Sequence, residues 1–281
     1  MRIGIIPNLE KENASVVLKK VISKLDSLNV EYILPEKSTF KDFVSNETGE
    51  CFDIIEQSDV VIAIGGDGTI IHTAKKSAIY SKAVLGINSG RIGYIAGIES
   101  NELDLLEQLV SGDFSIESRM MLKSVVSSAP DKVFYSLNDI VISKGPTDYA
   151  VDFSLIKGDK EFMNFRADGI IASTPTGSTA YAMSAGGPVT DPAIECVIVV
   201  PICPISLYSK GFVLSADSKI EVRFKPRGNS NAYVTFDGQD ACCLSQDDVV
   251  TLSKADDVVI RLVKIKNDSF YDVLKNKISV I

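Results

Sequence analysis

The sequence predicts an α/β plus all-β fold: a Rossmann-like α/β domain at residues 1–115, then a β-rich, β-sandwich-like domain at residues 116–263. In the first third of the chain, apolar runs alternate with helical periodicity, which favours a parallel sheet covered by helices. Short apolar or alternating runs dominate the rest, which is typical of half-buried strands. A length of 281 residues accommodates two such domains. We allow the last stretch, 264–281, to return to the first domain.

The first domain is expected to contain strands at 3–6, 30–34, 60–64 and 83–87, because each is a short apolar run. Asn13 is expected to cap a helix whose apolar residues recur at i+3 and i+4 as far as Leu28. Ser100 is expected to cap a second helix, which carries Leu103 and the apolar positions after it. The polar stretch 35–50 is expected to form a long loop.

The second domain is expected to be built from strands, with one helical interruption near residues 178–185. Gly158-Asp159 reads as the turn of a hairpin. Residues 220–224 alternate apolar and charged side chains, as a half-buried strand does. The other expected strands lie within 133–143, 151–157, 161–165, 234–236 and 258–263.

The composition is that of a globular protein, with 45% hydrophobic and 23% charged residues. A net charge of −8 disfavours sequence-independent binding to nucleic acid or to a membrane surface, so neither is expected as a partner. The five cysteines show no C-x-x-C spacing, which argues against zinc and favours a reducing, cytoplasmic location. No apolar stretch reaches membrane length, and no residue is assigned as a metal ligand.

The segment Gly65-Gly66-Asp67-Gly68-Thr69 follows an apolar strand and precedes a helical pattern. Glycines let backbone N–H groups approach a phosphate closely, and the start of a helix favours negative charge. Asp67 could accept the proton of a substrate hydroxyl at this point. The alternative is a structural turn in which Asp67 caps the helix.

A second motif is T-P-T-G-S-T-A-Y at residues 174–181, which continues to G-G-P at 186–188. Its small hydroxyl side chains suit hydrogen bonds to a base or ribose, and Tyr181 offers a ring for stacking. The alternative is an ordinary helix start capped by serine or threonine. Asn138-Asp139 interrupts an apolar strand, so one of the two side chains is expected to face a site or a turn. Taken alone, the segments 166–169 and 236–239 read as turns.

Together these motifs resemble the NAD kinase family, whose hallmarks are G-G-D-G-T, an N-E/D pair and T-P-T-G-S-T-A-Y followed by G-G-P, in that order. The stretch N-S-G-R-I-G-Y at 88–94 and D-G-Q at 237–239 also fit, so the resemblance spans roughly residues 60 to 240. It implies phosphorylation of NAD at the 2′-hydroxyl of the adenosine ribose. It also implies ATP or polyphosphate as donor, a divalent cation, for which we expect Mg²⁺, and a homodimer or homotetramer.

The resemblance also assigns roles to individual residues. Asp67 is the expected general base, and Gly68 is expected to hold phosphate. Asn138 and Asp139 are expected at adenine and ribose, and Arg166 with Asp168 at the nicotinamide ribose. His72 is expected either to reach a phosphate or to lie exposed on its helix. The remaining expected substrate contacts are Tyr94, Thr176, Thr179, Ala180, Tyr181, Ser184 and Gln239.

One segment departs from the family pattern. The family often has P-H-[ST]-L followed by R-P, whereas this chain has P-I-S-L-Y-S-K-G, with Ile205, Lys210 and Gly211 at the differing positions. The departure puts donor choice, local packing and subunit contacts in doubt. No P-loop and no dehydrogenase-type G-x-G-x-x-G is present. The alternatives that remain are a lipid or sugar kinase with the same glycine turn, and a non-catalytic dinucleotide sensor.

Overall fold

The computed structural model describes residues 1–36, 41, 49–90, 93–145, 149–206, 209–226 and 231–278. The chain divides into two compact units. Unit 1 comprises Met1–Ser118 and Val258–Ile281, and unit 2 comprises Arg119–Asp257. The division therefore falls after residue 118 and again after residue 257, whereas the sequence analysis predicts these boundaries after 115 and 263.

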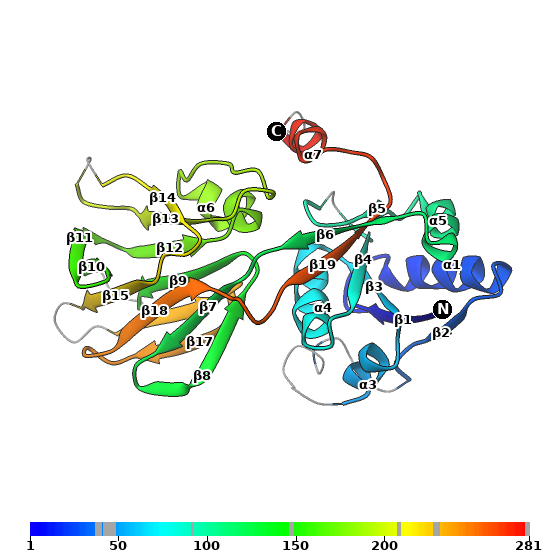
Figure 1. The fold of residues 1–281 in the computed structure, drawn as a ribbon, viewed down its shortest axis with the longest axis horizontal. Coiled ribbons are helices and arrows are strands. Elements are labelled where there is room, and N and C mark those ends of the chain that lie inside the picture. The colour runs from blue at the N-terminus through cyan, green and yellow to red at the C-terminus, as the bar shows by residue number, and fades with distance from the viewer. Residues whose placement is uncertain are drawn as a thin grey trace. The chain divides into compact units, whose positions relative to one another are not determined.

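Unit 1 is built on a sheet whose described strands run in the order β2-β1-β3-β4-β19-β6, with β5 paired to β4. The strands β1, β2, β3, β4, β5 and β19 pair in parallel. Their bounds are β1 Arg2–Pro7, β2 Glu31–Ile33, β3 Val60–Gly65, β4 Ala83–Asn88, β5 Ile98–Glu99, β6 Ser115–Arg119 and β19 Ile260–Lys264 (Figure 1).

Helices α1, α4 and α5 of unit 1 bury apolar side chains against this sheet. Val17, Val21 and Leu25 of α1 belong to one buried cluster with residues of β1, β3 and β4. Helix α4 packs so closely on β4 that a Cβ at Gly86 would lie 2.6 Å from Ile70. The helices are α1 Ala14–Ser27, α3 Glu50–Glu56, α4 Asp67–Ile79, the 3-10 turn η1 Leu103–Leu105, α5 Leu106–Ser111 and α7 Phe270–Ile278.

The expected strands of the first domain are confirmed, but several details are wrong. Asn13 does occupy the N-cap position of α1, yet it has a positive φ of 68° and makes no capping hydrogen bond through its side chain. Glu102, rather than Ser100, precedes η1. The run 258–263 is expected in the β-rich domain, but β19 lies in the parallel sheet. Helix α3 is not among the expected elements, and most of the expected loop 35–50 lies outside the described residues.

Unit 2 contains two six-stranded sheets, in the orders β11-β10-β15-β18-β7-β8 and β14-β13-β12-β9-β16-β17. Buried residues of both sheets form one core, in which Phe134 of β8 stacks on Phe236 of β16 with ring centroids 4.1 Å apart. The strand bounds are β7 Leu122–Val126, β8 Ala129–Ser136, β9 Asp139–Lys144, β10 Val151–Lys157, β11 Lys160–Ala167, β12 Gly169–Ser173, β13 Cys196–Ile202, β14 Phe212–Ser215, β15 Ile220–Lys225, β16 Ala232–Phe236, β17 Gln239–Leu244 and β18 Val249–Lys254.

The turns at 158–159 and 236–239 and the helical interruption of unit 2 are confirmed, whereas the reading of 166–169 as a turn is wrong, because β11 and β12 lie in different sheets. Gly158-Asp159 closes the β10–β11 hairpin, with a positive φ of 62° at Gly158. Asp237 and Gly238 both have positive φ, as a two-residue turn between β16 and β17 requires. The helical interruption consists of η2 Thr176–Thr179 and α6 Tyr181–Ser184.

The expected strand 133–143 is in fact two strands. The chain leaves β8 in one sheet and enters β9 in the other, so Leu137-Asn138 lies where the backbone passes from sheet to sheet. Asp168 lies at a second such crossing, between β11 and β12. Asn138-Asp139 and the pair Arg166 and Asp168 therefore lie beside changes of sheet.

None of the helices within the described ranges is long and apolar enough to cross a membrane.

Candidate active site

The glycine turn connects β3 to α4 at the carboxyl edge of the parallel sheet. Gly65 is required by packing, because a Cβ there would lie 2.4 Å from the hydroxyl oxygen of Thr69. That hydroxyl accepts a hydrogen bond from the Asn8 amide at 3.0 Å. By contrast, a Cβ at Gly66 or Gly68 would meet nothing within 4 Å. The space beside these two glycines is therefore open to a ligand at a helix N-terminus.

The Asp67 side chain has a defined orientation. Its carboxylate accepts backbone N–H bonds from Tyr94 at 2.8 Å and from Ile95 at 3.4 Å. Gly93 allows this approach, because a Cβ at that position would lie 2.0 Å from the carboxylate oxygen Oδ1. Gly93 and Tyr94 close the expected motif at 88–94, of which residues 91 and 92 lie outside the described residues. Two motifs of the sequence analysis thus meet at one carboxylate.

Other polar groups surround this edge of unit 1. The Asn88 amide donates to Glu99 at 2.7 Å and its oxygen accepts the Gly90 N–H at 3.1 Å. Burial raises the pKa of Glu99, and the charges of Glu102 and Asp67 act in the same direction. The sequence analysis does not identify Glu99, because only the pairing of β4 with β5 brings it beside Asn88. His72 is buried, with 9% of its surface exposed, so the expectation of an exposed helix position is wrong.

In unit 2, the crossing at Leu137-Asn138 is joined to the start of the T-P-T-G-S-T-A-Y segment. The Thr174 N–H donates to the Asn138 carbonyl at 2.9 Å, and its hydroxyl donates to the Leu137 carbonyl. That hydroxyl also accepts the Gly177 N–H at 3.1 Å. Gly177 is required here, since a Cβ would lie 2.1 Å from the Asn138 carbonyl oxygen. Motifs about 35 residues apart in sequence therefore form one backbone network.

Asn138 and Asp139 bring buried polar atoms to this crossing. Asp139 is only 5% exposed. Burial, followed by the charge of Asp237, raises the pKa of Asp139 from 3.8 to about 7. The side-chain oxygen of Asn138 is buried and accepts no hydrogen bond in the structure. Because buried polar atoms are rarely left without partners, this oxygen is suited to a donor group of a ligand.

The side chains of the 174–184 segment differ in how far they are exposed to solvent. Thr176 and Thr179 are buried, whereas Tyr181 is 46% exposed and Ser184 is also exposed. The Thr176 hydroxyl accepts a bond from the buried Arg119 guanidinium at 3.3 Å. Sequence reasoning missed Arg119, which lies 57 residues upstream and belongs to no motif. Ala180 and Gln239 are partly buried.

Arg166 and Asp168 do not pair with each other. Arg166 forms an ion pair with Asp152 at 2.6 Å, directly across the β10–β11 hairpin, and Asp168 pairs with Lys144 at 3.0 Å. In the β9–β12 register, Ser173 lies opposite Asp139 at one end, and Asp168 precedes the other end. Four residue steps at about 3.3 Å separate the two ends of β12, or about 13 Å. The expected adenine-side residues and Asp168 are therefore separated along β12, and Arg166 lies on β11 of the other sheet.

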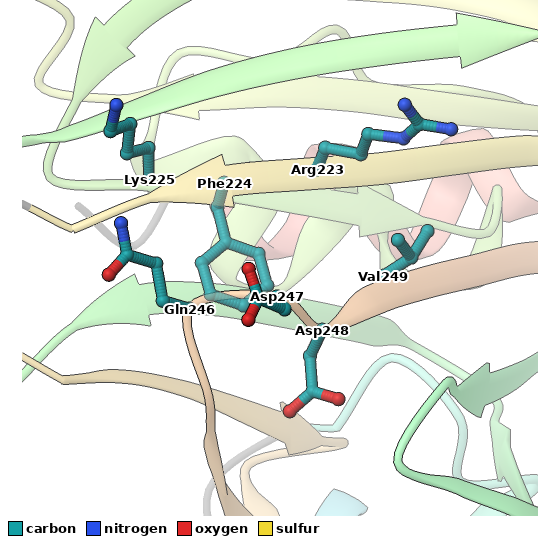
Figure 2. A pocket seen from close by; sticks show the side chains of 7 residues that line it. All are labelled: Arg223, Phe224, Lys225, Gln246, Asp247, Asp248 and Val249. Carbon is teal, nitrogen blue, oxygen red and sulfur yellow. The ribbon is translucent and has the colours of Figure 1, made fainter.

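A hollow of about 410 Å³ lies elsewhere in unit 2, between β15 and the turn that leads into β18 (Figure 2). Its lining mixes cations and carboxylates and contains none of the expected site residues. The lining residues are Arg223, Phe224, Lys225, Gln246, Asp247, Asp248 and Val249. This hollow is therefore not the site that the motifs form.

Comparisons with known proteins identify the family. The model of the ATP-NAD kinase N-terminal domain matches residues 3–114, and that of the ATP-NAD kinase C-terminal domain matches residues 137–264. An NAD kinase of Caldanaerobacter subterraneus subsp. tengcongensis is 35% identical over 281 residues, which cover 99% of each chain. An NAD kinase of Clostridium perfringens is 36% identical over 279 residues, or 98% of each chain.

Solved structures agree with this result. The crystal structure of an NAD kinase from Archaeoglobus fulgidus in complex with ATP has a TM-score of 0.76 and 28% identity, and the similarity covers 100% of both chains. The structure of yeast NADH kinase complexed with NADH has a TM-score of 0.83 over 98% of this chain and 85% of that one; at 21% identity it supports the fold alone.

These matches cover both units and overturn the alternative of a lipid or sugar kinase. The chain therefore belongs to the NAD kinase family and is a phosphotransferase that converts NAD to NADP with ATP.

Proposed function

We propose that the transfer goes to the 2′-hydroxyl of the adenosine ribose of NAD and that Asp67 is the general base. The observation that carries this proposal is the carboxylate fixed by two N–H groups at the start of α4, beside two glycines with open space at their Cβ positions. A base in this place takes the proton as the hydroxyl oxygen attacks phosphorus. The N–H groups of Tyr94 and Ile95 leave further lone pairs of the carboxylate available for that proton.

Gly66 and Gly68 are proposed to admit the phosphates of the donor to the backbone N–H groups of the first turn. Neither position needs glycine for packing within unit 1, because a Cβ added at either one would have no neighbouring atom within 4 Å. Close approach of phosphate supplies the missing reason for glycine. His72, which is buried on the same helix, is proposed as a further phosphate contact.

The residues of unit 2 are proposed to bind NAD. The buried acceptor of Asn138 fits an amino group of the adenine, and Asp139 fits a ribose hydroxyl. Arg166 of β11 and Asp168, which lies about 13 Å along β12 from the adenine side, are proposed for the nicotinamide ribose. The further substrate contacts proposed in unit 2 are Thr176, Thr179, Ala180, Tyr181, Ser184 and Gln239. Tyr94 of unit 1 is proposed separately as a substrate contact.

A divalent cation, which we propose is Mg²⁺, would neutralise charge on the transferring phosphate. No group of three or more histidine, cysteine or acidic side chains suited to a metal is present among the described residues. ATP-dependent enzymes usually hold Mg²⁺ through substrate phosphates, water and one or two carboxylates, so the proposal does not require such a cluster.

The remaining proposals concern the fold type, the assembly and the location of the protein. We propose that the parallel sheet of unit 1 is Rossmann-like, since its strands present the phosphate turn at their carboxyl ends. A homodimer or homotetramer is proposed from the family resemblance. A cytoplasmic location is proposed from the cysteine pattern, and the absence of nucleic-acid and membrane partners from the net charge of −8. Light scattering at several protein concentrations measures the assembly directly.

A coupled assay tests the proposed function. Purified protein is mixed with NAD⁺, ATP and Mg²⁺, and NADP⁺ is read through a dehydrogenase specific for NADP, with controls that omit each component. We expect NADP⁺ only when all three are present, or with polyphosphate in place of ATP. Binding of NAD⁺ without turnover under every donor and cation would instead favour a non-catalytic dinucleotide sensor.

A further inference from the structure

We propose that Asp237 is a positioning residue for NAD binding, which acts by holding the backbone that carries Asn138 and Asp139. The proposal rests on the function proposed above, because these two residues are the proposed contacts to adenine and ribose. Asp237 is not itself placed against the substrate. It lies about 100 residues downstream, in the tight turn between β16 and β17.

Four hydrogen bonds of Asp237 converge on the crossing between the two sheets. One carboxylate oxygen accepts the N–H of Asn138 at 2.7 Å and that of Asp139 at 3.2 Å. The other oxygen accepts the N–H of Leu137 at 3.0 Å. In return, the Asp237 N–H donates to the Asp139 carbonyl at 2.9 Å. Three successive backbone donors are thus satisfied by one side chain, which fixes the direction of the peptide planes there.

This arrangement replaces the β-ladder hydrogen bonds that the backbone cannot form at the crossing. Where the chain changes sheets, the N–H groups of residues 137 and 138 cannot join a β-ladder, and buried N–H groups need other partners. On the opposite side of the crossing, Thr174 binds the carbonyls of Leu137 and Asn138. Asp237 binds the backbone N–H groups of the crossing and Thr174 binds its carbonyl groups. Together these two residues therefore set the direction of the Asn138 side chain.

The variant Asp237→Asn tests this directly. An amide has one acceptor oxygen and one NH₂ group, so at least one of the three N–H groups would face another donor. Leaving such a group without its partner is expected to weaken NAD⁺ binding about 10-fold. ATP binds elsewhere in the proposal, so the KM for ATP should change less than about twofold.

Asp248→Asn is the matched control, because Asp248 has the same kind of role in another part of unit 2. Its carboxylate accepts the N–H groups of Ser128 at 3.1 Å and Ser245 at 2.8 Å. These turns lie away from the crossing. If Asp237 mattered only for stability, both variants would lower Tm and neither would alter NAD⁺ affinity selectively.

The experiment measures the Kd for NAD⁺ by calorimetry, the KM for ATP, Tm, and hydrogen exchange at residues 137–139 in the full-length wild type, Asp237→Asn and Asp248→Asn. Support would be a raised Kd for NAD⁺ and faster exchange at 137–139 in Asp237→Asn alone. A folded Asp237→Asn protein with unchanged NAD⁺ affinity would overturn the proposal.

A further variant covers the case in which Asp237→Asn does not fold. Thr174→Val removes the hydroxyl that binds the Leu137 carbonyl on the other side of the same crossing. Because that hydroxyl also accepts the Gly177 N–H, hydrogen exchange is measured as well. A raised Kd for NAD⁺ with faster exchange at residues 137–139 supports the proposal, and an unchanged Kd contradicts it. Wild-type protein that binds NAD⁺ but makes no NADP⁺ would refute the proposed reaction while leaving the binding comparison decisive for Asp237.

Discussion

Gly93→Ala should reduce turnover sharply, because it displaces the proposed base. The added Cβ would lie 2.0 Å from the Asp67 carboxylate oxygen, whereas Cβ atoms essentially never come within 3.0 Å of another heavy atom. The carboxylate must therefore move by about 1 Å or more. A misplacement of about 1 Å in a catalytic group can cost about 10²-fold in rate, so we expect kcat to fall by about that factor.

The assay is NADP⁺ formation at saturating NAD⁺ and ATP, with Tm measured on the same preparations. Gly90→Ala is the control, because it lies in the same segment and a Cβ there meets nothing within 4 Å. We expect kcat of this control to stay within about threefold of wild type. If folded Gly93→Ala protein kept wild-type turnover, the geometry assigned to Asp67 would be wrong.

Three further predictions concern unit 2. Gly177→Ala, whose Cβ would lie 2.1 Å from the Asn138 carbonyl oxygen, should destabilise the protein by about 1–3 kcal/mol in denaturant titrations; an unchanged midpoint would contradict this packing. Burial and a neighbouring carboxylate raise the pKa of Asp139 to about 7. The stability that the protonated Asp139 side chain contributes is therefore fully present below pH 3.8, the pKa in the unfolded chain, and is lost as the pH rises through 7. Asp139→Asn should therefore gain stability relative to wild type between pH 4 and 7, by up to about 4 kcal/mol, and a pH-independent difference would refute this. Lys144→Met breaks a partly exposed ion pair with Asp168, so KM for NAD⁺ should rise less than about fivefold, and a rise of 10²-fold would mean direct contact with substrate.

Much of the core of the molecule could be predicted from local pattern. The runs at 3–6, 60–64 and 83–87 are buried strands, because only a parallel sheet covered by helices hides such continuous apolar segments. The glycine turn was also predictable, since glycine and a helix start leave a local signature. The domain of the run 258–263 is predicted wrongly, because a short apolar run does not reveal which sheet it joins.

The supporting contacts of the site were not predictable, because they depend on long-range geometry. Arg166 pairs with Asp152 rather than Asp168, since the hairpin register places Arg166 and Asp152 directly opposite each other. Asp237 reaches the backbone at 137–139 only after the two sheets have formed. Nothing in the local sequence indicates which distant N–H groups a carboxylate will accept.

The most direct test of the central claim is the turnover of Asp67→Asn beside that of wild type, with Asp113→Asn, an exposed aspartate of unit 1, as control. Asparagine preserves the size of the side chain but cannot take the proton, and a positioned base contributes about 10²–10⁴-fold in rate. We predict that kcat for NADP⁺ formation falls by at least about 10²-fold in Asp67→Asn. The Tm of this variant and the kcat of Asp113→Asn should both stay near the wild-type values. Wild-type turnover in folded Asp67→Asn protein would contradict the assignment of Asp67 as the base.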